Sequence, residues 1–121
     1  MTQYNQFNQL VGDALPDWQP RRWPQRQTLQ GQLCRLEPLD VKHAQALFNA
    51  YRQAPDTRAW TWLLREPENS VTEFSAWIAS ISELNDPLHF AVIDERSGQP
   101  VGSLALMRID GKNGVVEVGH V

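Results

Sequence analysis

The chain has 121 residues, of which 41% are hydrophobic and 21% are charged, and its formal net charge is −3 at pH 7. This composition is typical of one globular domain rather than of a disordered chain. The negative net charge disfavours a dedicated nucleic-acid binder. No apolar run reaches the roughly 18–20 residues needed to span a bilayer, so no membrane segment is predicted.

The first ten residues and the cysteine content bear on the cellular compartment. The segment MTQYNQFNQL has neither a basic region nor an apolar core, so it does not read as a secretory signal peptide. The chain has one cysteine, Cys34, which cannot form an intrachain disulfide. We expect it to be a buried, unreactive thiol. Together these features favour the reducing cytoplasm.

Residues 1–28 have little hydrophobic periodicity and are rich in glutamine and asparagine. We interpret them as an extended arm that lies over the surface of a domain at 29–121. The stretch DWQPRRWPQR mixes tryptophans with arginines, which can stack on bases and contact phosphates of nucleic acid. Because the whole chain is acidic, we favour tryptophans that fasten the arm to the domain.

A strand and a helix are predicted next. Residues 29–38 have the apolar pattern of a strand, and Asp40 is a suitable N-cap for a following helix. His43 falls on the polar side of that helix, so we expect it to face solvent. The helix is predicted over 41–54 because apolar residues recur there at helical spacing, at Ala44, Leu47, Phe48 and Tyr51.

A second helix follows a tryptophan-rich link, DTRAWTWLL. Ser70 and Glu73 match the S-x-x-E capping box that starts a helix. The helix is predicted to end before Asn85, where turn-forming residues begin. Its apolar face comprises Val71, Phe74, Trp77, Ile78 and Ile81.

Three strands are predicted over 88–95, 100–110 and 115–121. Glycine-containing turn signals separate them, so they form an antiparallel meander. The predicted fold class is therefore α+β, with the order strand, helix, helix and then a three-stranded antiparallel meander. The last strand has an unpaired edge rich in valine, and such an edge invites pairing with a second copy of the chain as a homo-oligomer, for instance a dimer.

Two histidines, His89 and His120, fall in these strands. In strict alternation, His120 points away from the face that carries Glu117. A lone strand histidine is usually a surface or hydrogen-bonded residue, so neither is favoured as a catalytic base. No histidine or cysteine pair has the spacing of metal ligands, and no metal site is predicted.

The order of these elements, with three stretches inside them, resembles the first half of a GNAT N-acetyltransferase. CRLEPLDVKHAQALFNAY resembles the first strand and helix of the RimJ/RimL-like branch of that superfamily. FAVIDERSGQPVGSLALMRID resembles its second and third strands, and GVVEVGHV resembles its fourth strand. The resemblance spans about residues 29–121 and implies transfer of an acetyl group from acetyl-CoA to an amine acceptor, which the sequence does not identify.

In that family a glycine-rich loop after the fourth strand cradles the CoA pyrophosphate with backbone N–H groups. No loop of the R/Q-x-x-G-x-G/A kind occurs in this sequence. We therefore expect the N-terminal half of such an enzyme, truncated before the loop, with doubtful acetyl-CoA binding and no activity of its own. The alternative is a non-catalytic module that self-associates through 115–121.

The resemblance also implies a catalytic base, Glu117 on the fourth strand. The acceptor arrives as an ammonium and must lose a proton before it attacks the thioester. Glu117 lies among valines, where desolvation would raise its carboxyl pKa toward the working range. The alternative is a glutamate that faces solvent or pairs with an arginine.

Cofactor and acceptor contacts are implied as well. Backbone groups of Gly119, His120 and Val121 would bind the pantetheine arm and the oxyanion, with Gly119 in a bulge. A plain strand glycine is an equally good interpretation. The resemblance implies that three aromatic residues wall the acceptor pocket, namely Tyr51, Trp60 and Trp62. For the two tryptophans, simple packing is the favoured role.

Overall fold

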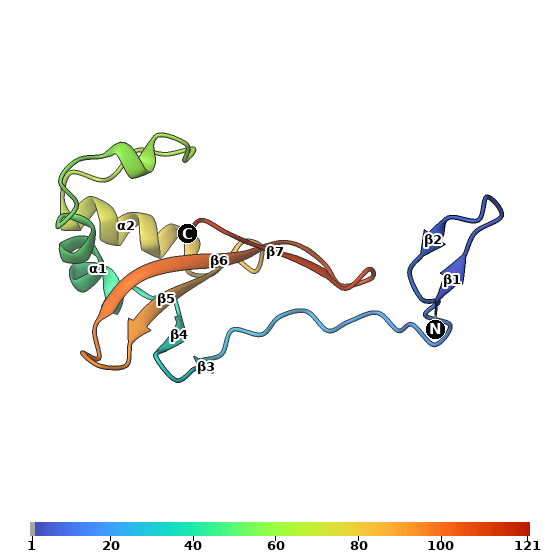
Figure 1. The fold of residues 1–121 in the computed structure, drawn as a ribbon. Coiled ribbons are helices and arrows are strands. Elements are labelled where there is room, and N and C mark those ends of the chain that lie inside the picture. Colours follow the sequence, from blue (N-terminus) through green and yellow to red (C-terminus); the bar gives the residue numbers. More distant parts are fainter. Residues whose placement is uncertain (1) are drawn as a thin grey trace.

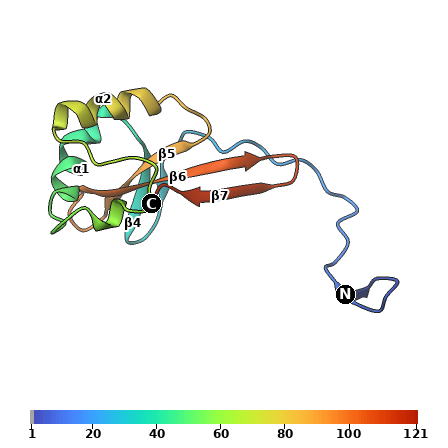
Figure 2. The same cartoon turned by 90° about the horizontal axis from the view of Figure 1, so that it is seen from above.

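The fold, described for residues 2–121 by a computed structural model, is built around a curled antiparallel sheet of five strands (Figure 1). The strands pair in the order β3-β4-β5-β6-β7, so neighbours in the chain are neighbours in the sheet. Two helices lie against one face of the sheet (Figure 2), and the predicted α+β class is confirmed. The sheet strands are β3 (Leu29–Gln30), β4 (Cys34–Pro38), β5 (Leu88–Asp94), β6 (Pro100–Asp110) and β7 (Val115–Gly119).

The helical elements connect β4 to β5. They are the 3-10 helix η1 (Val41–His43), α1 (Ala44–Tyr51), the 3-10 helix η2 (Arg58–Trp60) and α2 (Val71–Ile81). The predicted first helix is therefore shorter than 41–54, and its first turn is a 3-10 helix. The predicted strand over 29–38 is a short hairpin instead, because the Gly31 N–H turns back to donate to the Cys34 carbonyl at 2.9 Å. Cys34 lies exposed at this hairpin, so its predicted burial is wrong.

Local hydrogen bonds set the starts of both helices. The Asp40 carboxylate accepts from the Lys42 N–H at 2.8 Å, which confirms Asp40 as a cap. His43 completes a capping box by accepting from the Asp40 N–H at 3.1 Å, and its ring is buried rather than exposed. At α2 the Ser70 hydroxyl accepts from the Glu73 N–H, but the Glu73 carboxylate accepts from the Asn69 N–H in place of Ser70.

The hydrophobic core lies between the helices and the central strands. Alternate residues of β5 point toward the helices, as the period of a strand requires. Burial of these side chains holds the two helices against the sheet, and it leaves the start of β5, the middle of β6 and the end of β7 beside the link between the helices. Figure 1 shows the link above the sheet. The buried members of this core are Leu39, Ala44, Leu47, Phe74, Ile78, Ala91 and Ile93.

The β6–β7 hairpin contains one irregularity. Between the pairs Met107–Glu117 and Asp110–Val115, β6 has one residue more than β7. Arg108 adopts a φ of +49° at this bulge. The Asp86 carboxylate accepts from the N–H groups of residues 108 and 109 at 2.9 and 3.0 Å, so the backbone groups released by the bulge remain bonded.

The arm begins with a small hairpin of β1 (Gln3–Tyr4) and β2 (Leu10–Val11) and continues as an extended chain (Figure 1). The Trp18 indole donates to the Lys112 carbonyl at 2.9 Å. The Trp23 indole donates to the Asn85 carbonyl at 3.2 Å. Both tryptophans thus bond to backbone of the domain. Over residues 2–121 no helix has the length and apolar character needed to cross a membrane.

Candidate functional site

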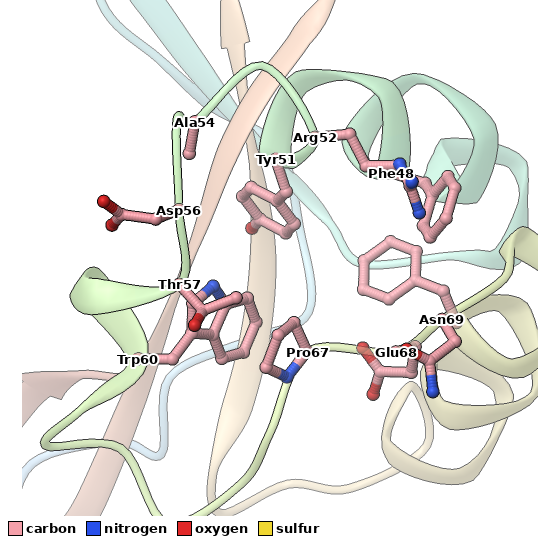
Figure 3. A pocket seen from close by; sticks show the side chains of 11 residues that line it. Phe48, Tyr51, Arg52, Ala54, Asp56, Thr57, Trp60, Pro67, Glu68 and Asn69 are labelled. Carbon is pink, nitrogen blue, oxygen red and sulfur yellow. The ribbon is translucent and has the colours of Figure 1, made fainter.

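Two adjoining cavities open beside the link between α1 and α2. The larger, of about 330 Å³, lies between η2, α2 and the ends of β5 and β7. The smaller, of about 260 Å³, lies between α1, η2 and the segment that leads into α2 (Figure 3). Tyr51 and Trp60 line both cavities, and their rings meet edge to face at 6.1 Å between centroids. The two hollows therefore share one aromatic wall.

Tyr51 is positioned by α1 and by a hydrogen bond across to β6. Its hydroxyl lies 2.7 Å from the Ser103 hydroxyl. Burial raises the pKa of the Tyr51 phenol, and the bond to Ser103 opposes this only in part. The phenol is therefore protonated near neutral pH and presents a hydrogen-bonding group to both cavities.

Replacing Tyr51 by phenylalanine is expected to lower the free energy of unfolding by about 1 kcal/mol, since the ring stays and only the bond to Ser103 is lost. Urea unfolding of Y51F, S103A and the double variant measures the coupling between the two hydroxyls. If the losses in the free energy of unfolding of the two single variants add up to that of the double variant, a hydrogen bond between the two hydroxyls is contradicted.

Arg65 forms the charged part of the larger cavity. Its guanidinium lies 3.4 Å from the centroid of the Trp77 ring and 4.9 Å from that of Trp60. It also forms an ion pair with Glu68, and both side chains are largely buried. The stacking and the ion pair hold the guanidinium between the two indoles, so it acts as a fixed wall of the cavity.

Two histidines meet where the start of β5 and the end of β7 line the larger cavity. His89, near the start of β5, is buried with 7% of its surface exposed. Its ring meets that of His120 at 5.4 Å between centroids and the edge of Trp77 at 6.2 Å. Burial, with repulsion from His120 and Arg65, lowers the pKa of His89 to about 4. His89 is therefore neutral at physiological pH.

Four of the residues predicted from sequence gather around the larger cavity: Tyr51, Trp60, His120 and Val121. Trp62 does not, since it is 91% exposed and lies outside both cavities. The link carries Trp60 inward on η2 and turns the next tryptophan to solvent. Neither the favoured packing role nor a place in the pocket wall therefore holds for Trp62.

Glu117 lies on β7 outside both cavities. Its side chain is half exposed, and its carboxylate is 3.6 Å from the Arg108 guanidinium. The expectation of a desolvated carboxyl among valines is therefore wrong, because β7 is an edge strand whose valines are themselves exposed. The geometry matches the alternative, a solvent-facing glutamate that pairs with an arginine.

Gly119 pairs with Ala105 in regular register, and the bulge of this hairpin lies in β6 instead. A side chain at position 119 would collide with Met107, so the glycine makes room for that methionine. His120 then takes a φ of +51° and leaves the strand, which ends one residue earlier. The predicted strand over 115–121 is therefore too long by two residues.

Sequence reasoning missed Arg65, Trp77, His89 and Ser103 as lining residues. Trp77 was assigned wholly to the core face of α2, and His89 was set aside as an ordinary strand histidine. The arginine that follows two leucines in the link was the available signal, since it is a cation inside an otherwise apolar stretch. Across residues 2–121 no group of three or more His, Cys, Asp or Glu could hold a metal.

The fold has counterparts among solved acetyltransferase structures. A GCN5-related N-acetyltransferase from Brucella melitensis is 44% identical over 88% of this chain and 48% of its own, with a TM-score of 0.82. A structure described as a probable acetyltransferase of the GNAT family, from Chromobacterium violaceum, is 26% identical over 92% of this chain and 56% of its own, with a TM-score of 0.75.

The α+β fold thus matches that of solved acetyltransferases, and these similarities support the GNAT superfamily for this chain. The chain spans about half the length of the solved structures that it matches. No family model matches the sequence, and the comparison with curated proteins gives no match.

Proposed function

We propose that this chain is the N-terminal half of a GNAT N-acetyltransferase of the RimJ/RimL-like branch, which moves an acetyl group from acetyl-CoA to an amine. The observation that carries the proposal is the match to the Brucella melitensis enzyme, in which 44% identity accompanies a TM-score of 0.82 over 88% of the chain. The proposal is supported by the cavity beside the end of β7, whose volume of about 330 Å³ and aromatic lining would suit a small acceptor.

The acceptor would lie against the aromatic wall. Tyr51, Trp60 and Trp77 offer ring faces and edges to its carbon skeleton, and the Tyr51 hydroxyl offers a hydrogen bond. Arg65, already paired with Glu68, would disfavour a second cation next to it. The acceptor amine is therefore expected to approach from the side of the two histidines.

The end of β7 fits the pantetheine arm of acetyl-CoA. β7 pairs with β6 on one side and has no strand on its other side among residues 2–121. Gly119 is the last residue of this free edge, and His120 and Val121, which follow it, line the larger cavity. Backbone groups there would hold an extended arm as a neighbouring strand does. When bound, acetyl-CoA supplies an activated acyl group.

Acetyl transfer is tested by incubating the chain with acetyl-CoA and a panel of aryl and alkyl amines, and by measuring free CoA and acetylated amine together. The proposal predicts that both products form in equal amounts and that bulky substitution at the acceptor wall, such as Ser103→Trp, abolishes them. Failure of every amine, with no heat of acetyl-CoA binding by calorimetry up to millimolar concentration, would contradict a working site in this chain.

A second candidate function, self-association, is favoured by the exposed edge of β7. Val116 and Val118 are 47% and 58% exposed on that strand. We propose that two copies pair through 115–121 and extend the sheet, since an unpaired apolar edge is a template for another strand. Light scattering after size exclusion measures the molar mass and tests this pairing. A wild-type chain that is monomeric at high concentration, with the same mass as V118K, would contradict it.

A further inference from the structure

Among the residues that the structure describes, no side chain lining the larger cavity carries a carboxylate. The side chains there that can gain or lose a proton are Tyr51, Arg65, His89 and His120. The phenol and the guanidinium are already protonated near neutral pH, so neither can accept a proton from an ammonium. Within this cavity the proton acceptors are the two imidazoles.

The two imidazoles differ in their access to solvent. His89 is buried under Trp77, and its neutral state is too weakly basic to capture a proton at neutral pH. His120 is exposed at the cavity mouth. A proton taken by His120 can therefore pass to water, whereas one taken by His89 would be trapped beside the fixed charge of Arg65.

The backbone brings His120 into this position. Strict strand alternation would place it on the face opposite Glu117, but its φ of +51° breaks the alternation where β7 ends. The ring then comes to rest 5.4 Å from that of His89. A left-handed conformation at a non-glycine residue is uncommon and often marks a functional position.

We propose that His120 is the general base of acetyl transfer in this chain, and that His89 is a positioning residue that holds its ring at the cavity. This inference rests on the proposed acetyltransferase function and replaces Glu117 in the role of base. Glu117 lies outside the cavity, and its half-exposed carboxylate is 3.6 Å from the Arg108 guanidinium.

Acetyl transfer then proceeds with two proton movements. The unprotonated imidazole of His120 takes one proton from the acceptor ammonium and becomes an imidazolium. The freed nitrogen lone pair attacks the acetyl carbonyl, and the carbon–sulfur bond breaks as the amide forms. The second ammonium proton goes from nitrogen to the departing thiolate, and the imidazolium releases its proton to water. The net products are the N-acetyl amine, the thiol and one proton.

The test uses an acetyl donor that needs no contacts with a CoA site. The loss of a catalytic base can then be told apart from the loss of cofactor binding. The 121-residue chain is incubated with p-nitrophenyl acetate and benzylamine, and N-acetylbenzylamine is measured above a blank without protein from pH 5.5 to 9. H120Q is expected to lose about 10- to 100-fold in rate, together with the rise of the rate with pH. E117Q, the comparison variant, is expected to lose less than twofold. Amide NMR spectra check that both variants remain folded.

A third variant addresses the positioning role. In H89N the amide keeps a hydrogen-bonding group near His120, so the rate is expected to fall less than in H120Q, while the pH at the midpoint of the rate profile moves. An unchanged midpoint would overturn the role given to His89. The imidazole ¹⁵N shifts of His120, followed in the same pH series, should report protonation with that same midpoint.

The outcomes distinguish the two proposals. Product from p-nitrophenyl acetate that depends on His120, with none from acetyl-CoA, supports the base and contradicts the cofactor function of this chain. If H120Q forms as much product from acetyl-CoA as the wild-type chain, the role of His120 as base is contradicted and the acetyltransferase function is not. A loss in E117Q equal to that in H120Q, or a wild-type rate no greater than the blank, also overturns the assignment of His120.

Discussion

Replacing Phe74 by alanine is expected to lower the free energy of unfolding by about 3–5 kcal/mol. Phe74 is 1% exposed and is the aromatic side chain that joins α2 to α1. Its ring lies 6.1 Å from Phe48, 5.9 Å from Tyr51 and 5.8 Å from Trp77 between centroids. Truncation therefore removes a large buried surface and several aromatic contacts at once, and it opens the floor of the smaller cavity.

Urea unfolding monitored by tryptophan fluorescence measures this loss, with Leu64→Ala as the matched control. Leu64 is fully exposed, so its truncation is expected to change the free energy of unfolding by less than about 0.5 kcal/mol. A loss below 1 kcal/mol in F74A would mean that α2 does not pack on the sheet as described.

Lowering the pH from 7.5 to 5 is expected to cost about 2 kcal/mol of stability through His89 alone. Burial lowers the pKa of His89 to about 4 in the folded chain, against about 6.5 when the chain is unfolded. The unfolded chain therefore binds a proton that the folded chain excludes. The contribution is fully present above pH 6.5 and is lost as the pH falls toward 4.

The measurement is urea unfolding of wild-type chain and His89→Gln at pH 7.5 and pH 5. The variant starts from a lower stability because its amide occupies a site shaped for an imidazole, but its own loss between the two pH values should be about 2 kcal/mol smaller. Carboxyl groups such as that of Asp94 titrate equally in both proteins and cancel in the difference. Equal pH dependence in the two would contradict burial of a neutral His89.

The fold was largely predictable because its signals are local. The apolar spacing of 71–81 follows one helical face, and that helix begins where the capping signal predicts but ends at Ile81, three residues before the predicted limit. The turn signals around Gly98 and Gly114 mark residues that adopt positive φ values of 69° and 66°, and both hairpins form there. These features depend on neighbours within a few residues, so they can be predicted without knowledge of the tertiary structure.

The site was less predictable because it depends on distant contacts. His43 was expected at the surface, but its ring is buried by capping and lies 3.4 Å from the Glu37 carboxylate. His120 was assigned by strand alternation, which fails where its φ becomes positive. Arg65 belongs to no periodic pattern in the sequence. Its guanidinium is held by the rings of Trp60 and Trp77, which lie on separate elements.

The most direct test of an acetyltransferase site at the end of β7 is a titration of ¹⁵N-labelled chain with acetyl-CoA, followed by amide chemical shifts. The account predicts that the largest changes occur at Gly119, His120 and Val121, with smaller ones at Ser103 across the cavity, and that plain CoA gives a weaker response near His120. Changes confined to the arm or to β3 and β4, or none at millimolar acetyl-CoA, would contradict it.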